Sequence, residues 1–330
     1  MLFVKLLGRK GFLSVIITIL MIGQVLLMHP NAVEASTSAR EEPIHGSIRV
    51  SGAWALYPMM VKWAEEFKKV YPGVRIDVSA GGAGKGITDA LSGLVDIGMV
   101  SRELRPEEIS QKAFYVPVVK DAVFPTINRN NAVFKELMQR GLKKKALADL
   151  WVAGRSLTWG ELAGAADKQK IRVYTRSDSC GAAETWAKYL GTMQEDLKGV
   201  GVYGDPGVAE AVRRDKTGIG YNNLNYVYDI KTGAPLPGLH VVPIDVNENG
   251  RIDREENLRT KQEAIRAILS GHYPSPPARD LYLVAKGSFK GPVKVFVHWI
   301  LTDGQKYIDE VGYLKISKTQ IKEALRKTGY

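Results

Sequence analysis

The chain has 330 residues, enough for two domains by size, and its 45% hydrophobic and 25% charged content excludes an intrinsically disordered protein. A formal net charge of +11 favours anionic ligands, but the basic residues are scattered and form no stripe interleaved with aromatic side chains, so nucleic-acid binding is not expected. Cys180 is the only cysteine, which excludes an intrachain disulfide.

The first 35 residues follow the order of an export signal. A basic start with Lys5 and Lys10 precedes an uncharged apolar run from Phe12 to Met28, and small residues follow as far as Ala35. This order predicts a cleaved signal peptide at residues 1–35 and a periplasmic or extracellular protein. Cleavage removes three bases and one acid and lowers the net charge from +11 to +9. The alternative is a retained membrane anchor, because the apolar run approaches the shortest spanning lengths.

Residues 48–100 alternate between strand and helix patterns. A short strand at residues 48–50 precedes apolar residues at helical spacing between Met60 and Tyr71, and residues 74–79 then alternate like a half-buried strand. A second helix is predicted at Ile87–Leu94 and another strand at residues 95–100. This alternation predicts an α/β fold with a parallel sheet and right-handed crossovers.

Four loops of similar character join predicted strands to predicted helices. They cover Ser51–Pro58, Ser79–Gly86, Val100–Glu108 and Arg176–Ala182, and the second of them is rich in glycine. Each loop would offer unpaired backbone N–H groups at the positive end of a helix, and the last adds the guanidinium of Arg176. Together they predict a compact oxyanion site, although each loop alone is better explained as a simple turn. None matches a Walker or dinucleotide-binding fingerprint.

Residues 245–256, DVNENGRIDREE, match the pattern of a calcium-binding EF-hand loop. Gly250 stands at the sharp turn, and the ligand positions are filled by Asp245, Asn247, Asn249, Arg251 through its carbonyl, Asp253 and Glu256. Strand-like alternation precedes the loop, and residues 254–269 read as a helix. We therefore expect one structural calcium ion in a single grafted loop; the alternative is a surface turn rich in Asp and Asn.

No catalytic constellation is visible in the sequence. The histidines show no zinc-ligand spacing, and no nucleophile elbow of the GxSxG type occurs. The chain is therefore predicted not to be an enzyme. An exported phosphohydrolase stays open as an alternative, since such an enzyme would share the anion affinity.

Several motifs between about Gly46 and Gly312 resemble those of the PstS-like phosphate-binding proteins of bacterial ABC transporters: ALYP, GGAGKGI, VDIGMVSREL, RSDSCGAAETWAKYL and GIGYNNLNYVYD. The resemblance implies the two-lobed α/β fold of type II periplasmic binding proteins, with mixed sheets flanked by helices and a hinge of crossing strands. Lobe I would comprise residues 45–125 and 285–330, and lobe II residues 126–284 with the calcium loop inserted. A monomer that delivers phosphate to a membrane permease is implied.

The resemblance also implies which residues hold the anion. Matched position by position, they are Ala55, Leu56, Gly82, Ala83, Ser101, Arg176, Cys180, Gly181 and Ala182. The family usually has a hydroxyl at the position of Leu56 and near Gly82, often an aspartate at that of Ser101, and Ser-Gly-Thr where this chain has Cys180-Gly181-Ala182. Cys180 is either a weak S–H donor to the anion or a small buried residue.

These departures leave the identity of the anion open. A carboxylate can accept the proton that phosphate carries at neutral pH, whereas a serine such as Ser101 donates or accepts and discriminates less sharply. Phosphate is the first expectation, and sulfate, molybdate or tungstate are the alternatives. An extracytoplasmic anion sensor or an adhesion module would use the same fold.

Overall fold

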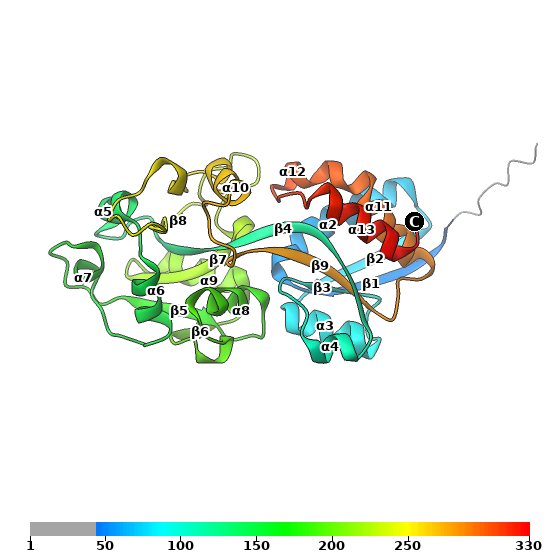
Figure 1. Ribbon diagram of the computed structural model, residues 1–330, viewed down its shortest axis with the longest axis horizontal. Helices are drawn as coiled ribbons and strands as arrows, with labels where there is room; N and C mark the ends of the chain where they lie inside the picture. Colours follow the sequence, from blue (N-terminus) through cyan, green and yellow to red (C-terminus); the bar gives the residue numbers. More distant parts are fainter. Residues whose placement is uncertain (1–43) are drawn as a thin grey trace, which may run out of the picture. The chain divides into compact units, whose positions relative to one another are not determined.

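A computed structural model describes residues 44–330, and the predicted export signal at residues 1–35 lies outside the described residues. Within the described part, nine strands are linked by hydrogen bonds in the order β2-β1-β3-β9-β4-β7-β5-β6, with β8 paired to β4 (Figure 1). Parallel and antiparallel pairs both occur, and helices flank the strands. The predicted mixed α/β fold is confirmed.

The first three strands are parallel, as the alternation of strand and helix predicted. They are β1 (Gly46–Gly52), β2 (Val74–Ala80) and β3 (Ile97–Val100), joined by α2 (Tyr57–Val70) and α3 (Ala83–Ser92). Helix α3 begins four residues before the predicted start at Ile87. The glycine-rich segment itself enters the helix, directly after Gly82 at a φ of 92°.

Two long antiparallel strands run from one half of the molecule into the other. Strand β4 (Ala113–Asn128) and strand β9 (Ala278–Lys286) pair with each other over most of β9 (Figure 1). Strand β9 also pairs with β3, whereas the end of β4 pairs with β7 (Gly218–Asn223) and β8 (Leu239–Val241). These are the crossing strands that the family resemblance implied.

Two large hydrophobic cores lie on either side of this crossing. We call the elements around the first core lobe I: β1–β3, α2–α4 and α11–α13, with Phe67 packed 4.8 Å from Phe296 between ring centroids. We call those around the second core lobe II: α5–α10 and β5–β8, with Trp186 packed 5.4 Å from Trp151 and 5.7 Å from Tyr221. Strands β4 and β9 contribute residues to both cores.

The remaining elements complete these lobes. Lobe I also contains α4 (Pro106–Ser110), α11 (Gly291–Leu301), α12 (Ile308–Val311) and α13 (Lys318–Thr328). Lobe II contains α5 (Phe134–Arg140), α6 (Lys144–Trp151), α7 (Trp159–Ala163), β5 (Arg172–Arg176), α8 (Gly181–Leu190), β6 (Val200–Val202), α9 (Gly204–Arg214) and α10 (Lys261–Leu269).

The helix predicted at residues 254–269 is shorter in the structure. Residues 254–256 form a single 3-10 turn, and α10 begins only at Lys261. The side chain of Thr260 accepts the N–H of Glu263, and the Glu263 carboxylate accepts the N–H of Thr260, which fixes the helix start. Leu258, between the two segments, is buried in the core of lobe II. The prediction was therefore wrong for residues 257–260.

Candidate functional site

Three of the four predicted loops leave lobe I at the same edge of its sheet. The parallel register places Gly52, the last residue of β1, beside Ala80 of β2 and Met99 of β3. A Cβ atom on Gly52 would lie 2.3 Å from the carbonyl oxygen of Met99, so a side chain here would force these strands apart. The missing side chain lets the loops after β1, β2 and β3 lie close together.

The fourth loop belongs to lobe II and joins β5 to α8. Cys180 is the N-cap of α8, and its Sγ accepts the N–H of Ala183 at 3.4 Å. Gly181 and Ala182 follow as the first two residues of the helix, where no carbonyl of the same helix can accept their N–H groups. Lobe II therefore presents two backbone donors at the positive end of α8.

The loops of the two lobes meet. The N–H of Gly84 in α3 donates to the carbonyl of Ser179 at 3.2 Å. A Cβ atom on Gly181 would lie 2.2 Å from both the carbonyl and the hydroxyl oxygen of Ser101, and one on Gly82 would lie 2.9 Å from a carboxylate oxygen of Asp178. Gly82 and Ser101 of lobe I are thus brought close to Cys180 and Gly181 of lobe II, and the contact leaves no room for a side chain at either glycine.

The guanidinium of Arg176 is fully buried beneath this contact. It donates to both carboxylate oxygens of Asp178, at 2.8 and 2.6 Å, and to Asp205 at 2.6 Å. Burial by itself would lower the pKa of Arg176, but the carboxylates of Asp205 and Asp178 outweigh it, and the pKa lies above its ordinary value. Arg176 therefore stays protonated and rigidly held, with the carboxylates of Asp178 and Asp205 paired to its one positive charge.

Sequence reasoning missed the polar residues that surround Arg176. Asp205 also accepts from the side chain of Asn223 at 2.7 Å, and Arg279 donates to the carbonyl of Gly181 at 2.5 Å. Burial raises the pKa of Asp121 to about 6, against the lowering effect of Arg279. Asp178 was discoverable, being two residues from Arg176; the others come from distant segments and no local pattern marks them.

The predicted backbone contacts are not equivalent. The N–H groups of Leu56 and Gly82 donate to the carbonyls of Ala53 and Gly52, at 3.1 and 3.0 Å, and that of Cys180 donates to the side chain of Gln194 at 3.1 Å. Ala83, in contrast, stands in the first turn of α3, where its N–H has no acceptor within the helix. Ala83, Gly181 and Ala182 are the stronger candidates as backbone donors.

The Cys180 thiol is buried, and this burial raises its pKa to about 12, against the lowering effect of Arg176. The thiol is therefore neutral near pH 7, which fits the small capping residue that it forms and excludes a reactive thiolate.

Comparisons with known proteins identify the family. Residues 37–303 match the model of a PBP superfamily domain. The chain belongs to the PBP superfamily. It is 26% identical over 290 residues to the phosphate-binding protein PstS of Bacillus subtilis, covering 87% of this chain and 86% of that protein. It is 23% identical to the PstS of Pseudomonas aeruginosa, covering 87% and 88% of the two chains.

A solved structure supports the same relationship. A Clostridium perfringens protein with bound phosphate, described as the substrate-binding protein of a phosphate ABC transporter, is 25% identical and aligns with a TM-score of 0.67. The alignment covers 82% of this chain and all of that one. The predicted resemblance to PstS-like binding proteins is confirmed.

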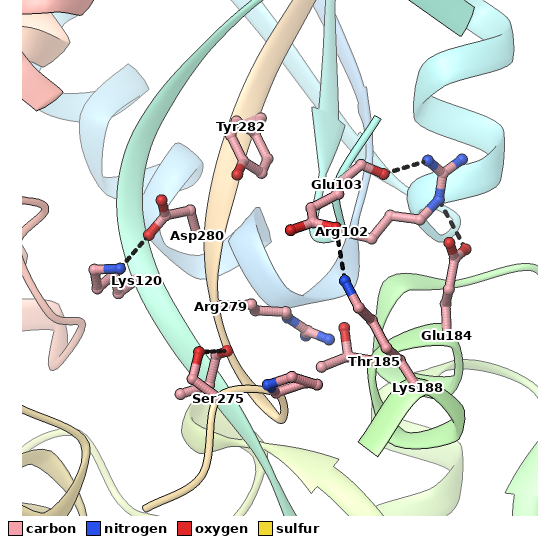
Figure 2. Close-up of a pocket in the computed structure, with 12 residues that line it drawn as sticks. Arg102, Glu103, Lys120, Glu184, Thr185, Lys188, Ser275, Arg279, Asp280 and Tyr282 are labelled. Carbon is pink, nitrogen blue, oxygen red and sulfur yellow. Dashed lines mark hydrogen bonds and ion pairs between the residues drawn. The ribbon is translucent and has the colours of Figure 1, made fainter. Parts of the chain in front are cut away.

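In this member of the PBP superfamily, a cavity of about 340 Å³ lies between the lobes beside the loop contact (Figure 2). Ion pairs join the lobes across it: Glu184 of α8 pairs with Arg102 at 3.0 Å and Arg105 at 2.9 Å, and Lys188 pairs with Glu103 at 2.7 Å. None of the nine predicted anion-binding residues lines this cavity. These pairs therefore stabilise the approach of the lobes without occupying the predicted anion site.

Within residues 44–330 no helix is long and apolar enough to cross a membrane. In the same range, no three His, Cys, Asp or Glu side chains converge as a group that would hold a metal ion by themselves.

Proposed function

We propose that this protein captures an inorganic oxyanion, phosphate first, between its two lobes and delivers it to an ABC permease. The observation that carries this proposal is the meeting of the starts of α3 and α8, one from each lobe, above the buried cation of Arg176. Backbone donors and a fixed guanidinium are the groups that bind tetrahedral oxyanions. The named relatives bind phosphate, which supports the choice of anion.

The proposed ligand set has two parts. Ala83, Gly181 and Ala182 supply backbone N–H groups, and Arg176 supplies the charge from below. Ala55, Leu56, Gly82, Ser101 and Cys180 complete the wall around the anion, with Ser101 the only hydroxyl among them. In this arrangement the protein acts as a binding protein and not as an enzyme.

The proposed cycle is capture followed by closure. The lobes, predicted at residues 45–125 with 285–330 and at residues 126–284, move about β4 and β9, the two strands that connect them and contribute to both cores. Residues 1–35 direct export, so capture takes place outside the cytoplasm and the permease receives the anion there. The protein works as a monomer.

A steric test exploits the contact between the lobes. Replacing Gly181 with alanine adds a methyl group 2.2 Å from the backbone of Ser101, so the lobes cannot approach as closely. We expect Gly181→Ala to raise the Kd for phosphate at least tenfold in calorimetry, about 1.4 kcal/mol. Gly201→Ala is the matched control, because its new Cβ would meet only Ser177, at 3.3 Å. Equal affinity in both variants would contradict the assigned site.

Ser101 also fits a binding protein for an oxyanion other than phosphate. Its hydroxyl has no fixed preference for a protonated anion, so sulfate, molybdate and tungstate are the alternative cargoes. If none of the four anions binds, the fold serves a sensor or adhesion role instead, and turnover of a phosphoester would indicate a hydrolase.

A further inference from the structure

The loop at residues 245–256 contains a buried carboxylate with an unsatisfied oxygen. The side chain of Asp245 points into its own loop, where Oδ2 accepts the N–H of Gly250 at 2.9 Å. Asp245 is only 1% exposed, and its Oδ1 has no hydrogen-bond partner among residues 44–330. A carboxylate oxygen buried without a partner is costly, and a cation bound here would remove that cost.

The other polar side chains of the loop form hydrogen bonds with one another and with the loop backbone. Asp253 Oδ2 accepts from the side-chain amides of Asn247 at 2.9 Å and of Asn249 at 2.8 Å. Glu256 is 7% exposed, and its carboxylate accepts the N–H groups of Val246 at 2.8 Å and of Asp253 at 3.2 Å. The side chains at loop positions 3, 5 and 9 are therefore linked to one another, and the carboxylate at position 12 is linked to the loop backbone.

The backbone has the turn that such a loop requires. Gly250, at position 6, has a φ of 84°, and a Cβ atom there would meet nothing within 4 Å. Glycine is therefore favoured here by the backbone conformation, and not by a lack of space for a side chain. This turn follows Asn249 and precedes Arg251, whose carbonyl is the ligand at position 7 of an EF-hand loop.

The donors suit calcium because they are not all carboxylates. Three carboxylates by themselves do not converge on a metal site here, but calcium also accepts amide and backbone carbonyl oxygens. In this structure the Oδ1 atoms of Asn247 and Asn249 accept the N–H groups of Asn249 and Arg251, at 3.1 and 3.0 Å, so both amides must rotate before their oxygens can join the carboxylates around an ion. The oxygen count then reaches the six or more that calcium takes.

The loop is attached to the segment between α5 and α6. The N–H of Ile252 donates to the carbonyl of Gln139 at 2.7 Å, and that of Asp245 donates to the carbonyl of Leu142 at 3.1 Å. Lys143 donates to the carbonyl of Glu248 at 2.9 Å. An ion that fixes the loop would therefore also fix residues 139–143 of lobe II.

From these contacts we propose that residues 245–256 bind one calcium ion, with oxygen ligands from Asp245, Asn247, Asn249, Arg251, Asp253 and Glu256. The ion stabilises lobe II by holding the loop on residues 139–143. This role is independent of the anion cargo. A loop in an exported protein meets abundant calcium, so a Kd of about 0.1–1 mM is sufficient.

The test is calorimetric titration of the chelator-treated protein with calcium chloride, alongside thermal unfolding with and without calcium. We expect saturable binding of one ion and a rise of a few degrees in Tm at about 5 mM calcium. Glu256→Gln should weaken calcium binding at least tenfold, since it removes the bidentate carboxylate. Glu255→Gln is the matched control, because the neighbouring Glu255 is exposed and outside the ligand set.

Three results would overturn the proposal: no saturable binding up to about 10 mM calcium, equal binding of magnesium, or unchanged affinity in Glu256→Gln. Hydrogen exchange of the unmodified protein provides a measurement that does not depend on a variant folding. Calcium should slow hydrogen exchange at residues 245–256 and 139–143. If calcium leaves the exchange rates there unchanged, the proposed calcium site is wrong.

Discussion

The two sides of the proposed anion site, one from each lobe, differ in chemistry. Lobe I offers backbone, apolar side chains and one hydroxyl, at Ser101, whereas lobe II offers a buried charge network around Arg176. Both sides contribute the start of a helix. In the proposed anion site we therefore expect lobe II to supply most of the binding energy, and lobe I to close over the anion and set its selectivity.

The largest expected effect comes from removing the charge of lobe II. Arg176→Ala should raise the phosphate Kd at least tenfold in calorimetry, because the cation is lost and the carboxylates of Asp178 and Asp205 are left facing the anion. Breaking a buried ion pair on one side also costs about 3–5 kcal/mol of stability, so Tm should fall. Adding Asp205→Asn should restore part of that Tm but not the affinity. An unchanged Kd would remove Arg176 from the site.

The second prediction concerns pH and the charge network. Asp121 has an ordinary pKa of 3.8 and a pKa of about 6 in the folded protein, so between these values the folded state holds a proton that the unfolded state has released. Its contribution therefore lowers the free energy of unfolding as pH rises from about 4 to 6, by up to about 3 kcal/mol.

Urea unfolding of wild type and Asp121→Asn at both ends of this window measures the difference. The variant should gain stability relative to wild type as pH rises. If the difference in free energy of unfolding between the two proteins stayed constant from about pH 4 to about pH 6, burial would not raise the pKa of Asp121.

The third prediction tests selectivity on the lobe I side. Ser101→Asp should weaken sulfate binding more than tenfold and phosphate binding by less, because only phosphate carries a proton that the carboxylate can accept at neutral pH. Competition calorimetry with both anions gives the ratio. Ser101→Asn, of similar size but uncharged, is the control, and an equal loss for both anions would place the selectivity elsewhere.

The smallest expected effect lies at the rim, where Glu184 of lobe II pairs with Arg102 and Arg105 of lobe I. Partly exposed ion pairs contribute about 0–1 kcal/mol, so Glu184→Gln should speed phosphate dissociation by up to about fivefold in stopped flow. Lys188→Gln, which breaks a more exposed pair with Glu103, should change it less. A slower release in Glu184→Gln would mean that these pairs favour opening.

The sequence was sufficient to predict the elements that local pattern controls. Strand and helix periodicity placed β1–β3 and α2, and the predicted loop at Arg176–Ala182 contains the start of α8. The sequence pattern could not predict which residues pair with Arg176. Asp205 and Asn223 come to Arg176 because β7 and α9 pack beside β5, and no spacing rule connects residues so far apart.

Local competition between signals explains the misplaced helix starts. The glycines at residues 82–86 read as loop, yet those after Gly82 lie within α3. Residues 254–269 have continuous helical composition, yet the capping pair of Thr260 and Glu263 and the burial of Leu258 end one turn and start another. In both cases a local backbone or capping contact, and not the residue composition, determines where the helix begins.

Calorimetric titration of the anion-stripped protein with phosphate, sulfate, molybdate and tungstate shows whether an oxyanion binds where the starts of α3 and α8 meet. We predict saturable binding of one phosphate per chain, tighter than the other three anions. If none of the four anions binds, the protein does not capture an inorganic oxyanion.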